Sequence, residues 1–223
     1  MRDIFFRKQT NILSAAFVIM ATYGISHMFG LFKTRLLISH FFGTSAANLD
    51  VYYAALVIPD TIFQLLVIGA LSAAFIPTFT RYLSQNESAA WRMAATTINV
   101  VLAVFVFICA GVFLLASPLS HLIAPGFSTS QIITMSNLLR IMLMAQLFFS
   151  ISGFLTGIIQ SHQRFLIPAL APVAYNLGII LGITVFYPAF GFKGLAWGVV
   201  VGAVAHLLIQ VPFAMKASLL PKP

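Results

Sequence analysis

Two basic residues inside an apolar stretch near the N-terminus are the first candidates for chemistry. Lys33 and Arg35 lie in the segment FGLFKTRLLISHFFG, and no other charged residue occurs between Gln9 and Asn48. A basic residue near the centre of a bilayer costs about 2.5–3.5 kcal/mol on insertion scales, so such residues usually face a partner or a water-filled cavity. A pair of cations there could bind a phosphate group, and the planar guanidinium of Arg35 suits two-point phosphate binding.

Spacing separates the two cations, because residues two apart on a helix do not share a face. We favour Arg35 as the residue that faces a binding site, with Lys33 close behind. The alternative is that both side chains reach the outer lipid headgroups. Lys33 lies about 31 Å along a helix that starts at Ile12, which is roughly the thickness of one bilayer core. Against this alternative, the apolar run LLISHFF continues beyond Arg35.

A carboxylate and an amide follow in the next apolar run. Asp60 comes directly after Pro59. Proline has no N–H, so within a helix the carbonyl of Ala55 would lose its hydrogen-bond partner. The free carbonyl, Asp60 and Gln64 one turn later make a candidate site for an ion, a proton or a substrate. The alternative is that Asp60 is a structural partner for an arginine.

Four further polar residues have simpler interpretations. Asp50 opens the second apolar helix, where a carboxylate suits the helix N-terminus. Arg140 comes about ten residues into the fourth helix and either faces a cavity or reaches outward to the headgroups. Asn176 on the fifth helix is expected to form a hydrogen bond between helices. His206 on the sixth helix is expected to be packed rather than functional, and it extends a stripe of small residues that permits close helix approach, namely Gly194, Gly198 and Gly202.

The composition of the chain indicates whether these residues lie in water or in a membrane. Of 223 residues, 61% are hydrophobic and only 7% are charged, whereas soluble domains carry roughly 25% charged residues. Apolar runs of the ~20 residues that cross a bilayer recur along the chain. The sequence therefore predicts an all-α polytopic membrane protein.

Several function classes are disfavoured by the same residues. The net charge of +8 comes from dispersed residues rather than a basic cluster with interleaved aromatics, so nucleic acid is not an expected partner. The single cysteine, Cys109, lies in an apolar run and can form neither a disulfide framework nor a metal site. No nucleophile–base pattern, metal cluster or phosphate-cradling glycine loop is present, so we expect neither an enzyme nor a bound metal or cofactor.

Proline, glycine and polar stretches divide the chain into one six-helix transmembrane lobe that occupies residues 1–223. The polar stretches RYLSQNESAAWR and SPLSHLIAPGFSTS, and the turns GTSAAN, SHQRF and YPAFGFKG, are expected to connect the helices. The six expected spans are residues 11–42, 50–76, 93–116, 131–160, 166–186 and 195–215.

Lysine and arginine distribute unequally between the two sides of this lobe. With the N-terminus inside, eight basic residues lie on the inner side and one, Lys193, on the outer side. The eight are Arg2, Arg7, Lys8, Arg81, Arg92, Arg164, Lys216 and Lys222. Because inner loops carry the excess of Lys and Arg, both termini are predicted to be cytoplasmic.

The chain resembles the N-terminal part of the MurJ (MviN) family of lipid II flippases, within the superfamily of multidrug, oligosaccharidyl-lipid and polysaccharide exporters. The resemblance lies in FGLFKTRLLISHFFG, in LDVYYAALVIPDTIFQLLVIGALSAAFIPTFTRYL, in IAPGF and in the segment from NLLRIML to NLGII. It covers nearly the whole chain, but only the first of the two lobes that family members have.

The resemblance implies a flippase in the bacterial cytoplasmic membrane that moves an undecaprenyl-pyrophosphate-linked cell-wall precursor outward by alternating access. Its expected partners are this lipid-linked precursor, membrane lipids and a second lobe from a continuing chain or another subunit. First-helix arginines of the family face a central cationic cavity and contact the pyrophosphate. Lys33 or Arg35 corresponds to one of them, His27 stands where another is usual, and Asp50 matches the acid that begins the second helix.

The sequence departs from the family pattern after the IP motif. The family shows Asn, then two arginines, then an acid, whereas this chain has Asp60, Phe63–Gln64 and Ile68. Two expected substrate-side cations are therefore missing. The alternatives are a flippase for another lipid-linked oligosaccharide or polysaccharide, and a non-transporting membrane scaffold derived from the same fold.

Overall fold

The structure is a computed structural model that describes residues 12–41, 46–69 and 71–216, and every regular element in these ranges is a helix. The long helices are α2 (Ile12–Phe41), α3 (Ala46–Phe63), α4 (Ile76–Gln85), α5 (Glu87–Leu114), α7 (Thr129–Ser161), α8 (Leu166–Leu181) and α10 (Phe192–Leu208). Short helices are α6 (Ala116–Ile123), α9 (Tyr187–Phe190) and α11 (Val211–Lys216). Three π-helical segments are η1 (Gln64–Ile68), η2 (Leu71–Phe75) and η3 (Gly182–Phe186).

Five helical segments of the described residues are long and apolar enough to cross a membrane. They are Leu49–Ile68, Glu87–Leu114, Thr129–Ser161, Leu166–Phe190 and Phe192–Met215. Helix α2 is not one of the five, although its 30 residues extend over about 45 Å. The prediction of an all-α polytopic membrane protein is confirmed.

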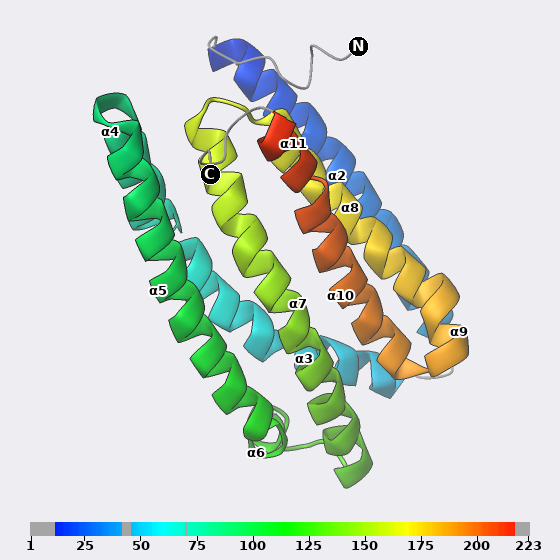
Figure 1. Ribbon diagram of the computed structural model, residues 1–223. Coiled ribbons are helices and arrows are strands. Elements are labelled where there is room, and N and C mark those ends of the chain that lie inside the picture. The colour runs from blue at the N-terminus through cyan, green and yellow to red at the C-terminus, as the bar shows by residue number, and fades with distance from the viewer. Residues whose placement is uncertain (1–11, 42–45, 70, 217–223) are drawn as a thin grey trace.

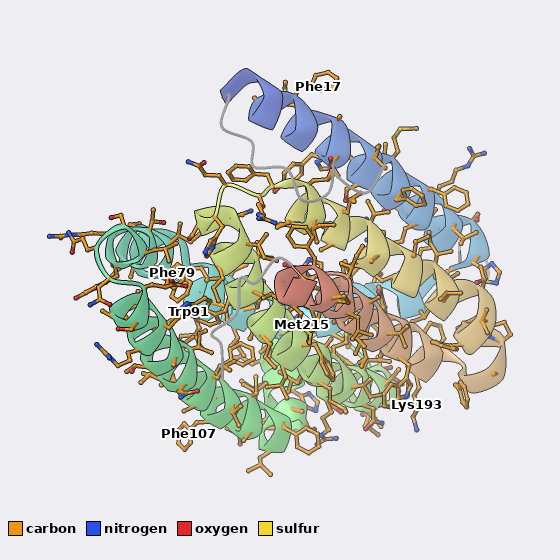
Figure 2. All side chains as sticks on the ribbon, turned by 45° about the horizontal axis from the view of Figure 1, so that its top comes forward. Phe17, Phe79, Trp91, Phe107, Lys193 and Met215 are labelled. Atoms are coloured by element: carbon orange, nitrogen blue, oxygen red, sulfur yellow. The ribbon has the colours of Figure 1, made fainter. Side chains whose placement is uncertain are left out.

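Helix α7 occupies the middle of the lobe and packs against α3, α5 and α10, while α8 packs between α2 and α10 (Figure 1). Helix α7 begins at Thr129 because Ser128 and Gln131 form a reciprocal capping box. Helix α5 lies at the edge of the lobe, and its Phe107 is 80% exposed and projects outward (Figure 2). The outward-facing apolar side chains are consistent with contact between this edge and lipid.

Two connections differ from the expected loops. The stretch RYLSQNESAAWR is almost wholly helical, because α4 runs to Gln85 and α5 begins at Glu87, so that the third span starts before residue 93. The break is Asn86, whose side-chain oxygen accepts a hydrogen bond from the Ala89 N–H at 3.1 Å and caps α5. The stretch SPLSHLIAPGFSTS contains helix α6 instead of forming only a loop. Residues 43–45 of the GTSAAN turn lie outside the described residues, and its second half is helical, because α3 begins at Ala46 rather than at residue 50.

Helix ends gather at two sides of the lobe (Figure 1). The start of α2, the α4–α5 and α7–α8 connections and α11 lie at one side, which we call the α4 end. Helices α6 and α9, with the starts of α7 and α10, lie at the other side, the α9 end. Arg81, Arg92 and Arg164 belong to connections at the α4 end, and Lys193 belongs to the α9 end. The remaining inner-side basic residues of the orientation prediction are outside the residues whose side chains the structure describes.

Helix α8 and its continuation η3 approach α10 closely along glycines. A Cβ atom added to Gly198 would lie 2.5 Å from the Cα of Gly182, and one added to Gly182 would lie 2.7 Å from the Cα of Gly198. Gly178 and Gly202 form a second backbone contact of the same kind. The glycine stripe on the sixth helix therefore packs against a neighbouring backbone, as predicted, because larger residues would hold the two helices apart.

Replacing Gly198 with leucine is expected to lower the free energy of unfolding by more than about 3 kcal/mol. Overpacking usually costs about 1–3 kcal/mol, and here the obstacle is a backbone that cannot rotate away. Gly111→Leu is the matched control, since a Cβ at Gly111 meets nothing within 4 Å. Thermal unfolding in detergent compares the two variants. An unchanged melting temperature for Gly198→Leu would mean that this face does not pack as described.

Candidate functional site

A polar cluster joins α2, α3 and α7 within the apolar lobe. Asp60 on α3 accepts a hydrogen bond from Gln146 Nε2 of α7 at 2.9 Å. Lys33 on α2 is half-buried and lies within electrostatic range of Asp60. The opposite charges attract across the space between the first two helices, and the low dielectric of the membrane interior strengthens such an attraction.

Gln146 is the most deeply buried member of this cluster, with only 2% of its surface exposed. Its Nε2 donates to Asp60, but its buried Oε1 has no hydrogen-bond partner. A buried acceptor without a donor is unfavourable by about 1–3 kcal/mol. The cluster therefore holds a carboxylate with one fixed donor, a nearby ammonium and a free amide oxygen.

Two tyrosines border the carboxylate. Tyr52 on α3 and Tyr175 on α8 lie within electrostatic range of Asp60, and Tyr52 is buried. Tyr175 packs edge-on against Phe149 of α7, with their ring centroids 4.9 Å apart. Asp60 itself is exposed, so these aromatic side chains border the polar cluster without enclosing it.

Pro59 shapes the element that carries Asp60. It lies inside α3, where its missing N–H leaves the Ala55 carbonyl without its usual helical partner. The α-helix ends at Phe63, and the π-helical segments η1 and η2 continue the same stretch. Single π-helical turns inside α-helices frequently occur at functional sites, because they change the direction of the following side chains.

The structure separates the two cations of the opening motif. Lys33 is half-buried and within electrostatic range of Asp60 on α3, whereas Arg35 is exposed; among the described residues, neither cation forms an ion pair within 4 Å. The position of Lys33 near Asp60 thus favours Lys33, whereas the planar guanidinium favours Arg35 on chemical grounds. His27, Asp50 and Gln64 are also exposed, and none of them joins the contact between Asp60 and Gln146.

Arg140 and Asn176 lie away from this cluster. The Arg140 side chain donates from Nε to the Phe113 carbonyl at 3.2 Å and from Nη1 to Asn137 Oδ1 at 3.4 Å, and it covers the Phe113 ring. Asn176 Nδ2 donates to the Ser26 carbonyl at 3.2 Å, which joins α8 to α2. The expected hydrogen bond between helices is confirmed for Asn176.

A cavity of about 520 Å³ begins at Phe63, three residues after Asp60, and extends toward the α4 end; none of Lys33, Asp60 and Gln146 lines it. Tyr23 of α2 and Phe63 and Ile68 of the second span form its sides, and residues of α7 and α8 form its floor. Phe63 is one turn from Asp60, so the cavity leads toward the cluster along α3. Its polar lining includes Thr156, Gln160 and His206.

His206 is held by structural contacts. Ser152 Oγ lies 2.7 Å from His206 Nδ1, and the His206 ring packs edge-on against Phe149. The prediction that His206 is packed is confirmed, although the residue also borders the cavity.

Sequence reasoning missed Gln146 as the direct partner of Asp60. The signal was present, because Gln146 is an uncharged polar residue in the run IMLMAQLFF, far from either end of α7. A lone amide in such a run requires a partner on a neighbouring helix. Nothing in the sequence identifies that partner, since Gln146 and Asp60 are 86 positions apart.

Comparison with known proteins decides the family. Residues 38–223 match the family model described as lipid II flippase MurJ. The chain belongs to the MurJ family. Lys33 and Arg35 precede the matched residues.

Curated relatives in the MurJ family align with nearly the whole chain. The chain is 31% identical to the probable lipid II flippase MurJ of Buchnera aphidicola subsp. Schizaphis graminum, over 96% of this chain and 42% of that protein. It is 28% identical to the lipid II flippase MurJ of Burkholderia cenocepacia, over 95% of this chain and 42% of that protein. The chain therefore spans less than half the length of the curated MurJ relatives that it matches.

A solved structure shares the fold. It is described as lipid II flippase MurJ in an inward closed conformation, and the TM-score is 0.74 at 22% identity. The match covers 90% of this chain and 42% of the other chain. The helical lobe thus has the MurJ fold.

Proposed function

We propose that the chain is the N-terminal lobe of a flippase that carries lipid II, an undecaprenyl-pyrophosphate-linked peptidoglycan precursor, across the bacterial cytoplasmic membrane. The observation that carries this proposal is the cluster of Lys33, Asp60 and Gln146, which joins α2, α3 and α7. Family membership supports the same substrate class, because the relatives are named lipid II flippases.

The cluster has the chemistry that a pyrophosphate needs on leaving water. A phosphate anion loses its hydration there, and charge-assisted hydrogen bonds from a lysine or an arginine replace it. Asp60 balances the charge of Lys33 while no substrate is bound, which lowers the cost of holding a cation in the membrane. An arriving pyrophosphate then competes with Asp60 for Lys33, and the exposed Arg35 on the same helix supplies a second cation.

The cavity beside the cluster suits the rest of such a substrate. Tyr23 of α2 and Phe63 of α3 border it, the rest of its lining comes mainly from the second span, α7 and α8, and most of the lining residues are apolar or aromatic. We propose that a second lobe closes the open side of α2 and α3 and that the two lobes alternate access to the site. The activity is then transport rather than catalysis, and residues 1–223 form one of the two lobes.

Complementation tests this proposal. Cells depleted of their own flippase are supplied with this chain joined to the second lobe of a MurJ-family protein. Growth should be rescued, and lipid II should become accessible to a degrading enzyme added outside. Lack of both rescue and accessibility, with the protein present in the membrane, would contradict the proposal.

A second candidate is a flippase for a different lipid-linked glycan. Phe63, Gln64 and Ile68 occupy positions where the family resemblance leads us to expect two arginines and an acid, and Phe63 and Ile68 line the cavity as apolar side chains. An apolar wall suits a less highly charged headgroup than that of lipid II. Rescue of a strain that lacks another polyprenyl-linked glycan exporter, without rescue of the lipid II strain, would favour this candidate.

The orientation of the lobe is also a proposal. The α4 end carries Arg81, Arg92 and Arg164, and inner loops carry the excess of basic residues, so we propose that this end and both termini are cytoplasmic. In a Cys109→Ala background, cysteines at Ser128 and Ala189 are expected to react with an impermeant thiol reagent added to intact cells, and one at Asn86 is not. The residues at all three positions are exposed on the protein, so a difference in labelling reports the side of the membrane and not burial of the cysteine. Labelling only at Asn86 would show that the lobe has the opposite orientation to the one proposed.

A further inference from the structure

Three neighbouring hollows lie at the α9 end of the lobe, and none of them is lined by Lys33, Asp60 or Gln146. The first, of about 370 Å³, is an apolar groove between α5 and α7 that includes Phe113, Leu143 and Met144. The second, of about 280 Å³, shares Phe113, Arg140 and Met144 with the groove and adds Asn137 and Lys193. The third, of about 330 Å³, shares Asn137 and Lys193 with the second. The three form a continuous path from apolar to polar surroundings.

The polar half of this path is cationic. Lys193 near the start of α10 is exposed, points outward (Figure 2) and forms no ion pair with a described residue. Arg140 is held in place by the Phe113 carbonyl and ring and by Asn137, so its guanidinium is oriented before any ligand arrives. No aspartate or glutamate is among the described residues that line the hollows. Neither cation is therefore neutralised by a carboxylate of the lining.

The apolar half of the path is long enough, and lies at the right level in the membrane, to hold part of a lipid acyl chain. Leu147 lies two turns from Arg140, so the groove extends about 10 Å further into the membrane, somewhat less than the thickness of one leaflet. Phe113, Leu114 and Met144 are exposed along membrane-spanning helices. An occupant can therefore enter the groove sideways from the bilayer.

We propose that this path binds an anionic glycerophospholipid, with its phosphate between Arg140 and Lys193 and one acyl chain in the groove between α5 and α7. Charge complementarity favours an anionic headgroup over a zwitterionic one, and the apolar groove favours a lipid over a soluble phosphate. Under the proposed orientation this lipid belongs to the extracytoplasmic leaflet. The site is separate from the transport site and does not depend on the substrate proposed for it.

Fluorescence quenching by brominated lipids tests the site locally. The reporter is Phe113→Trp in the full chain, with Trp91 and Trp197 replaced by phenylalanine; the substitution keeps an aromatic ring beside Arg140. In phosphatidylcholine nanodiscs that contain about 10% phosphatidylglycerol, bromination of the phosphatidylglycerol chains should quench the introduced tryptophan at least threefold more than bromination of an equal amount of phosphatidylcholine. Arg140→Gln/Lys193→Gln should abolish this preference, whereas Arg81→Gln/Arg92→Gln, with the same loss of charge at the α4 end, should retain it.

A second variant tests the groove without changing charge. Ala110→Phe places a ring in the groove between α5 and α7 and should also reduce the quenching by brominated phosphatidylglycerol to the level of phosphatidylcholine. Equal quenching by both lipids in the unsubstituted site would overturn the proposal and leave only nonspecific boundary lipid. Loss of the preference on addition of inorganic phosphate would also overturn it, because the site would then take a soluble anion.

Discussion

In the chain joined to a second lobe, replacing Lys33 and Arg35 together with alanine is expected to abolish the proposed transport of a lipid-linked precursor while the protein stays folded in the membrane. Without these residues, α2 offers no lysine or arginine to replace the hydration of a pyrophosphate. Arg35 is exposed and Lys33 only half-buried, so their removal deletes little packing. The rate at which lipid II becomes accessible outside flippase-depleted cells should fall by at least about tenfold, which corresponds to about 1.4 kcal/mol in the transport barrier, while the melting temperature changes little.

Matched variants separate this effect from a general loss of charge. Arg81→Ala/Arg92→Ala removes two cations from the α4 end and should leave transport intact. Arg35→Lys should retain partial function at best, because lysine lacks the planar two-point geometry of arginine. Normal transport by the double alanine variant would mean that Lys33 and Arg35 only anchor α2 at the lipid headgroups.

Replacing Asp60 with alanine is expected to destabilise the lobe by about 1–3 kcal/mol, because Gln146 would then lose its acceptor. The Gln146 amide is 2% exposed and its oxygen already lacks a partner, so the whole buried amide would be unsatisfied. Lys33 would lose its nearby countercharge at the same time. Equilibrium unfolding in mixed detergent micelles measures the change.

A double-mutant cycle identifies the hydrogen bond as the cause. Asp60→Ala/Gln146→Leu removes both partners, and replacing both by apolar groups is often nearly neutral. The double variant should therefore recover most of the stability that Asp60→Ala loses. A double variant as unstable as the sum of the two single variants would show that Asp60 and Gln146 act independently.

The helices themselves could be predicted from hydropathy, because a membrane requires long apolar segments with internally satisfied backbones. The connections were harder to predict. Residues 81–92 contain the charged and polar residues typical of a loop, yet a single cap at Asn86 is enough to turn the chain from α4 into α5. Polarity indicates exposure to water, and an exposed segment can still be helical.

The sequence predicted the residues of the candidate site, Lys33 and Asp60, but not which residues contact each other. The types and depth of Lys33 and Asp60 indicated that each needs a partner within the membrane. Which cation meets the carboxylate depends on how α2 rotates against α8, and a tertiary contact such as that between Asn176 and Ser26 controls this rotation. Helical periodicity gives relative faces but not the rotation of a helix against its neighbour, so it could not distinguish Lys33 from Arg35.

Direct binding of defined polyprenyl lipids tests the central claim, that the cluster joining α2, α3 and α7 recognises a pyrophosphate. The 223-residue chain in nanodiscs would be titrated with undecaprenyl pyrophosphate, undecaprenyl monophosphate and uncharged undecaprenol. We predict that the pyrophosphate binds at least about tenfold more tightly than undecaprenol, a difference of 1.4 kcal/mol, and that Lys33→Ala/Arg35→Ala removes this preference while Arg140→Gln/Lys193→Gln retains it. Equal affinity for the three lipids, or a preference that survives the loss of Lys33 and Arg35, would contradict the claim.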